Sequence, residues 1–151
     1  MSGRSRLLGV DYGQVRVGLA ISDDERRFAS PLTTYQRRDV EKDAVFFREV
    51  VAEEEVAEIL VGLPLHLDGR EGQKACEARA FGQWLADVTK LPVIFWDERF
   101  STVEAESALW EAGLTHKRRK ARRDRVAAQM FLQSYLEADC PGEQPSRALN
   151  E

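Results

Sequence analysis

The order of short apolar segments is the feature of this sequence that most restricts its fold. Three apolar runs, at residues 7–10, 15–21 and 28–35, follow one another near the start of the chain. The polar connections between them are too short for a helical crossover, so we expect three antiparallel strands. Pro31 in the third run cannot donate a backbone hydrogen bond, which favours an edge position for that strand.

Helical and extended segments alternate in the rest of the chain. Apolar residues recur at helical spacing from Ala44 to Val51, and Asp39 ahead of them suits an N-cap. The segments expected after this helix are a strand at 58–64, a helix through 75–85, a strand at 91–96, a helix from about Thr102 to Glu111 behind a capping box, and a last helix beginning near Arg123.

This order predicts an α/β fold with a five-stranded mixed sheet, in which three antiparallel strands are followed by two parallel ones and helices cover both faces. We expect one domain over residues 1–138. Residues 139–151 contain two prolines, a glycine and few apolar groups, which predicts a disordered tail.

The net charge, the cysteine spacing and the lengths of the apolar runs argue against several classes of protein. A net charge of −4 argues against a protein that coats nucleic acid or membrane through its overall field. Cys76 and Cys140 show neither metal-ligand spacing nor a disulfide framework, which favours a reducing compartment. The polar N-terminus resembles no signal segment, and no run approaches the roughly 18 apolar residues of a membrane span. We therefore expect a cytoplasmic protein with no membrane partner.

Acidic residues stand at the ends of the predicted elements. Asp11 ends the first strand and the Asp97–Glu98 pair ends the fifth, and sites in such sheets form at the carboxyl ends of parallel strands. Asp124 shares a helical stripe with Ala128 and Phe131, where an ionised group is costly unless it has a partner. A bound cation would remove that cost, so we expect these acids to meet.

Convergent carboxylates favour metal-assisted chemistry. Mg²⁺ and Mn²⁺ prefer hard oxygen ligands. Two such ions can activate a water on one side of a phosphodiester and stabilise the leaving oxygen on the other. The sequence therefore predicts a site for Mg²⁺ or Mn²⁺, with two ions expected.

Each acid also has a purely structural interpretation. Asp11 could belong to a hairpin turn. Asp97 and Glu98 could cap the following helix or pair with Arg99, and Asp124 could be the N-cap or a first-turn acid of the last helix. Only the joint arrangement favours a catalytic site.

Positive charge is concentrated beside Asp124. A charge run is usually a solvated surface, but its position next to a predicted metal ligand favours contact with a phosphate backbone. The residues of this basic stretch are Lys117, Arg118, Arg119, Lys120, Arg122 and Arg123. Arg16 either points toward a substrate phosphate or lies on a strand face.

Four ordered motifs resemble those of the YqgF family, also called RuvX. They are residues 11–20, residues 61–65 with Asp68-Gly69, residues 97–102 with Glu104-Ala105, and Asp124 with Ala127-Ala128 and Tyr135-Leu136. The resemblance covers nearly the whole chain. It implies an RNase H-like fold related to the RuvC resolvases, and a nuclease that either resolves Holliday junctions or matures the 5′ end of 16S ribosomal RNA precursors.

The resemblance also implies roles for individual residues. Asp11, Glu98 and Asp124 would be the catalytic, metal-binding acids, with Asp97 as the adjacent alternative. We assign Arg99, Ser101 and Thr102, together with Arg16 and the basic stretch, to substrate binding. The expected partner is branched DNA or precursor rRNA, and symmetric cutting of a four-way junction would require a homodimer. The alternative function is a non-catalytic nucleic-acid-binding or ribosome-assembly factor.

Overall fold

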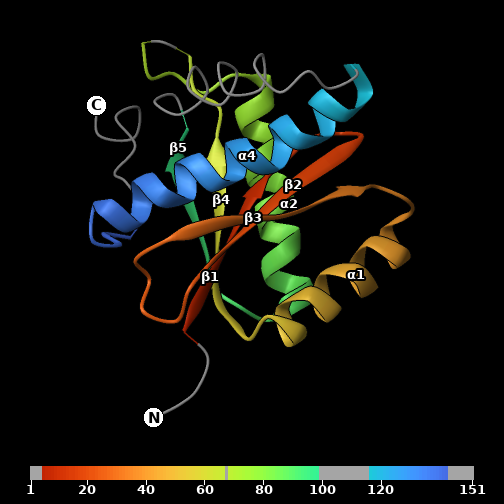
Figure 1. The fold of residues 1–151 in the computed structure, drawn as a ribbon. Helices are drawn as coiled ribbons and strands as arrows, with labels where there is room; N and C mark the ends of the chain where they lie inside the picture. Colours follow the sequence, from red (N-terminus) through yellow and green to blue (C-terminus); the bar gives the residue numbers. More distant parts are fainter. Residues whose placement is uncertain (1–4, 67, 99–115, 143–151) are drawn as a thin grey trace.

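The computed structural model describes residues 5–66, 68–98 and 116–142, and within 116–122 it describes the backbone alone. Five strands form one sheet in the order β3-β2-β1-β4-β5 (Figure 1). The strands are β1 (Arg6–Asp11), β2 (Arg16–Ser22), β3 (Ala29–Gln36), β4 (Val56–Leu63) and β5 (Val93–Asp97). β1, β2 and β3 pair antiparallel, whereas β4 pairs parallel with both β1 and β5. The predicted mixed sheet is confirmed, and Pro31 lies on the edge strand β3.

Three helices of the described residues lie on the two faces of this sheet. α1 (Val40–Glu53) and α2 (Gln73–Thr89) cover one face, and α4 (His116–Glu137) crosses the other (Figure 1). Asp39 caps α1 as predicted, because its carboxylate accepts the Lys42 N–H at 2.8 Å. None of the helices in the described part of the chain has the length and apolar content of a membrane span.

Alternating strand residues form two apolar clusters, one on each face of the sheet. On β1, Leu8 and Val10 join the cluster beneath α1 and α2, whereas Leu7 joins Phe131 and Leu132 beneath α4. This period-2 alternation fixes which side chains can approach each helix. α4 therefore contacts the strand residues that share a face with Leu7, and not those that share a face with Leu8 and Val10.

The last helix begins at His116, and not near Arg123 as the sequence analysis predicted. Lysine and arginine are good helix formers, and residues 116–125 contain neither glycine nor proline to end a helix. The basic stretch therefore forms the first turns of α4 instead of a loop ahead of it. The helix predicted from Thr102 to Glu111 lies outside the described residues.

The described chain turns back after α4. The Gly142 N–H donates to the Tyr135 hydroxyl at 3.0 Å, and Cys140 packs against the apolar cluster beneath α4. The remainder of the predicted tail, residues 143–151, lies outside the described residues.

Glycine on the sheet face beneath α4 lets this helix approach the strands closely. A side chain on Gly18 of β2 would overlap the backbone of Asp124, so α4 rests directly on this strand. Gly9 of β1 lies against α4 with more room, because a Cβ there would stand 3.2 Å from Leu132 Cβ. Close contact at Gly18 thus fixes where Asp124 lies over the sheet.

We predict that Gly18→Ala lowers the unfolding free energy by about 1–3 kcal/mol, because the added methyl group must displace helix backbone. Gly9→Ala, the matched control on the same face, should cost less, since its added methyl group would stand 3.2 Å from Leu132 Cβ and 3.3 Å from the Ala128 carbonyl oxygen instead of overlapping helix backbone. Urea unfolding of the two variants measures the difference. Equal losses would show that the contact at Gly18 does not limit the packing of α4.

Candidate active site

Asp11 lies in a cleft at the carboxyl ends of β1 and β4. It is the last residue of β1 and pairs with Gly18 of β2. The cleft has a volume of about 710 Å³, and its lining includes Glu98, Asp124 and Gly62. Asp11 is therefore a strand residue facing a cleft, and the hairpin-turn interpretation of this residue is wrong.

Glu98 reaches the same cleft from the end of β5. Its N–H donates to the Leu63 carbonyl at 3.3 Å, which extends the pairing of β5 with β4 by one residue. Strand alternation turns Glu98 to the face that carries Trp96 and α4. Its Oε2 atom occupies the space that a side chain on Gly62 would fill. Gly62 therefore makes room for this carboxylate beside Asp11.

Asp97 is buried and is absent from the residues that line the cleft. The sequence left Asp97 and Glu98 as adjacent alternatives. The structure brings Glu98, and not Asp97, into the cleft with Asp11.

Asp124 enters the cleft from well inside α4, so it neither caps this helix nor belongs to its first turn. Its backbone rests on Gly18, and its carboxylate accepts the Arg16 Nε–H at 2.9 Å. Arg16 is the first residue of β2, so one strand positions both the backbone and the carboxylate of Asp124. The structure thus brings three predicted acids together from β1, from the end of β5 and from α4.

Burial and mutual repulsion perturb these carboxyl groups. Burial raises the pKa of Asp11 well above its usual value, and the neighbouring charges of Glu98 and Asp124 raise it further. Burial, followed by the charge of Asp97, raises the pKa of Glu98 to about 7, although Lys74 opposes this shift. These shifts show that acidic charge is concentrated in a poorly solvated place, as is common at catalytic sites.

The chemistry of this donor set fits a divalent metal ion. Asp11, Glu98 and Asp124 offer carboxylate oxygens, which Mg²⁺ and Mn²⁺ prefer, and a cation would relieve the repulsion among them. Across the described ranges, no three histidine, cysteine or acidic side chains form a ready-made metal-ligand cluster. The fit therefore rests on the type of ligand and on the shared cleft.

Two further residues of the cleft, one cationic and one polar, were not predicted from the sequence as site residues. Lys74, in the first turn of α2, lines the cleft and acts electrostatically on Glu98. Gln14 donates to Glu77 Oε1 at 3.2 Å and so links the β1–β2 loop to α2. Gln14 follows the carboxyl end of β1 and Lys74 follows that of β4, and these positions were an available signal, because sites collect at that edge of a sheet.

A second layer of contacts supports the loop that follows Asp11. The Arg37 N–H donates to the Val15 carbonyl at 2.9 Å, and its guanidinium lies 5.6 Å from the ring centre of Tyr12. Arg37 also donates to buried Asp43 at 3.3 Å, and Asp43 accepts the Tyr35 hydroxyl at 2.7 Å. These contacts connect the cleft loop to the start of α1.

The remaining predicted substrate residues are only partly described. Arg99, Ser101 and Thr102 lie outside the described residues. The basic stretch lies in the first turns of α4, and of its side chains only that of Arg123 is described, as exposed. Arg16 lies in the cleft, paired with Asp124.

Comparison with known proteins identifies the family. The family model described as RuvX, Holliday junction resolvase, matches residues 5–138. The chain belongs to the RuvX family. A relative from Rhodopirellula baltica, named "Putative pre-16S rRNA nuclease", is 46% identical over 133 residues, which are 88% of this chain and 77% of the relative. A relative of the same name from Syntrophomonas wolfei is 41% identical over 138 residues, covering 91% of this RuvX protein and 98% of the relative.

Solved structures share the fold at low sequence identity. RuvC of T. thermophilus, in complex with a Holliday junction substrate, matches with a TM-score of 0.57 and 16% identity, covering 93% of this RuvX chain and 99% of RuvC. A Fowlpox virus resolvase in complex with junction DNA matches with a TM-score of 0.53 and 11% identity, over 88% and 97% of the two chains. This RuvX protein therefore has the RNase H-like fold that its sequence predicted.

The raised pKa values give a prediction about stability in metal-free buffer. Folded Glu98 retains its proton up to about pH 7, whereas the unfolded chain loses it near the usual value of 4.5. The folded state binds more protons in this window, so the unfolding free energy should fall as pH rises through it. The raised pKa of Asp11 acts in the same direction. A hydrogen bond from Arg79 lowers the pKa of Glu71, so this group changes the unfolding free energy only at pH values below the usual 4.5, outside this window.

Thermal unfolding of the wild type and of Glu98→Gln at about pH 5 and about pH 8 measures this dependence. The wild type should melt at a lower temperature at the higher pH, and the variant should show a smaller difference. The same pH dependence in both proteins would contradict the assignment of a raised pKa to Glu98.

Proposed function

We propose that this RuvX protein is a divalent-metal-dependent endonuclease that cleaves phosphodiester bonds in structured nucleic acid. The observation that carries this proposal is the convergence of Asp11, Glu98 and Asp124, from separate elements, in one cleft. Nuclease activity is consistent with the family and with the names of its relatives. The metal dependence and the substrate are the parts that we propose.

The three acids would hold Mg²⁺ or Mn²⁺, with two ions expected. When bound, such ions ionise an attacking water and stabilise the leaving oxygen of a phosphodiester. The chain itself contributes the orientation of the three carboxylates, through Gly18, Gly62 and Arg16. Ligand carboxylates must be ionised, so binding at neutral pH would release the proton that burial favours on Glu98.

The substrate would be branched DNA, precursor rRNA, or both. The basic turns at the start of α4 precede Asp124 in the chain, so we propose that they contact the phosphate backbone next to the cleft. Lys74 supplies a further cation inside the cleft. On a four-way junction, symmetric cutting would require a homodimer with two active sites. Maturation of precursor rRNA would place the protein in the cytoplasm.

We predict that Asp11→Asn and Asp124→Asn each reduce cleavage by at least about a thousandfold, because each removes a charged ligand oxygen from the site. Asp87→Asn, on the exposed surface of α2, is the matched control and should retain activity. Synthetic four-way junctions and a precursor-rRNA fragment, each assayed with Mg²⁺ or Mn²⁺, serve as substrates. Equal cleavage by the wild type and Asp11→Asn would contradict the proposed mechanism.

The same assay separates the alternative function. A non-catalytic binding or ribosome-assembly factor would bind these nucleic acids without turnover at any metal concentration. Cleavage that follows metal occupancy would exclude this alternative.

We predict that replacing Arg118, Arg119 and Arg122 together with alanine weakens binding to unrelated sequences and reduces its salt dependence. Each phosphate contact that is lost should lower the slope of log affinity against log salt by about one. Fluorescence anisotropy at several salt concentrations measures the slope. If the slope is unchanged, the basic stretch does not contact nucleic acid.

A further inference from the structure

Arg16 forms an ion pair with one of the three acids of the cleft. Its Nε lies 2.9 Å from Asp124 Oδ2, and the two side chains are 31% and 23% exposed. The pair is thus partly shielded from solvent, so its interaction is stronger than that of a fully exposed pair. Gly18, two residues along the same strand, contacts the backbone of Asp124.

The position of Arg16 affects the charge that any cation in the cleft would meet. Asp11, Glu77, Glu98 and Asp124 supply negative charge, and within the described residues Lys74 and Arg16 supply positive charge to the lining. Lys74 acts on Glu98, whereas Arg16 acts on Asp124. The Arg16 guanidinium and a divalent cation would both bind the Asp124 carboxylate. Because both are positively charged, they would repel one another and compete for this ligand.

We propose that Arg16 is a positioning residue that acts as the resident counter-charge of Asp124, holding this carboxylate over the cleft in the metal-free protein and weakening the affinity of the acids for divalent cations. This inference rests on the proposed function in one respect, namely that the acids bind such a cation. It differs from both interpretations of Arg16 that the sequence offered, which were a contact with substrate phosphate and a place on a strand face.

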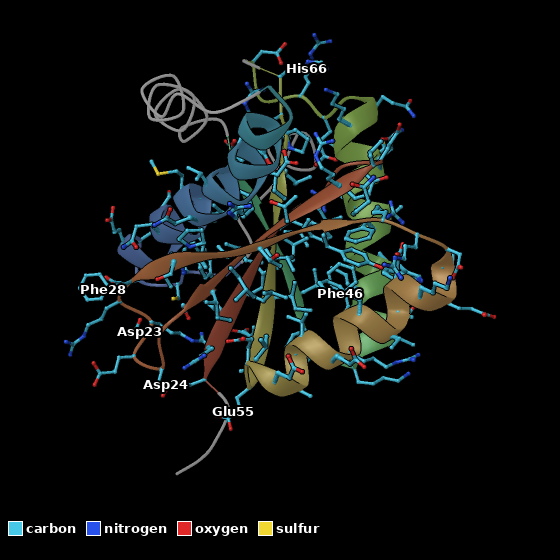
Figure 2. All side chains as sticks on the ribbon, turned by 45° about the vertical axis from the view of Figure 1, so that its right-hand side comes forward. Asp23, Asp24, Phe28, Phe46, Glu55 and His66 are labelled. Carbon is cyan, nitrogen blue, oxygen red and sulfur yellow. The ribbon has the colours of Figure 1, made fainter. Side chains whose placement is uncertain are left out.

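Another ion pair of the chain provides a matched control. Arg26 Nη1 lies 2.9 Å from Glu58 Oε1, and these side chains are 27% and 28% exposed. Glu58 lies near the start of β4, and Arg26 belongs to the β2–β3 hairpin with Asp24 and Phe28. Figure 2 shows Asp24 toward the lower end of the molecule and His66, which follows the cleft end of β4, at the top. The Arg26 pair thus has similar geometry far from the acids.

The test compares full-length wild type, Arg16→Gln, Arg16→Lys and Arg26→Gln. Mn²⁺ is the probe, its free concentration is followed by electron paramagnetic resonance, and the melting temperature is measured without metal. Arg16→Gln should bind Mn²⁺ about fivefold more tightly than the wild type, the upper range for a partly exposed charge pair. Arg16→Lys should remain near the wild type because it keeps the charge.

Comparison of the melting temperature with the Mn²⁺ affinity distinguishes the proposed role of Arg16 from that of an ion pair that only stabilises the fold. Both Arg16→Gln and Arg26→Gln should lower the metal-free melting temperature, but only Arg16→Gln should change the affinity for Mn²⁺. Unchanged or weaker Mn²⁺ binding by folded Arg16→Gln would overturn the inference, as would an equal gain in Arg26→Gln.

Failure of this inference can be distinguished from failure of the proposed function. If the wild type binds Mn²⁺ and cleaves nucleic acid while Arg16→Gln binds Mn²⁺ with unchanged affinity, only the role of Arg16 fails. If Arg16→Gln binds Mn²⁺ more tightly but neither protein cleaves, the role of Arg16 stands and the nuclease proposal fails. If neither the wild type nor Arg16→Gln binds Mn²⁺, both fail.

Discussion

The close packing of α4 against the sheet is the contact on which the candidate active site depends. A helix can approach a strand this closely only where a side chain is missing, and Gly18 provides that position beneath Asp124. Gly62 makes a second space on the same face, which the Glu98 carboxylate occupies. Asp11, at the end of β1, lines the cleft with both acids. The packing of the fold and the assembly of the three acids therefore have the same cause.

This arrangement brings negative charge together at a cost in stability. Burial and mutual repulsion raise the pKa of Asp11 and of Glu98, so the metal-free site carries unfavourable electrostatic energy at neutral pH. Arg16 and Lys74 offset part of this energy within the protein. A divalent cation would offset more of it, which links the stability of the fold to the proposed chemistry.

Much of the fold could be predicted from the sequence, because strand order and pairing follow from run lengths, short connections and the edge preference of Pro31. The convergence of the acids also followed from Asp11 and the Asp97–Glu98 pair at strand ends and from Asp124 on the apolar stripe of the last helix. The choice between Asp97 and Glu98 did not, since it depends on strand parity at a terminus, which only the pairing of β5 with β4 fixes. The start of α4 was misplaced because the basic residues ahead of Arg123 were not included in the helix, although lysine and arginine are good helix formers. The Arg16–Asp124 pair joins residues far apart in the chain, so no local pattern indicates it.

The most direct test of this account is to locate a bound ion. Crystals of the protein grown or soaked with Mn²⁺ can be measured at a wavelength where manganese scatters anomalously. We expect an anomalous peak in the cleft, from an ion coordinated by carboxylate oxygens of Asp11, Glu98 and Asp124. Mn²⁺ bound only outside the cleft, or no anomalous peak in the cleft at saturating Mn²⁺, would contradict the proposed metal site.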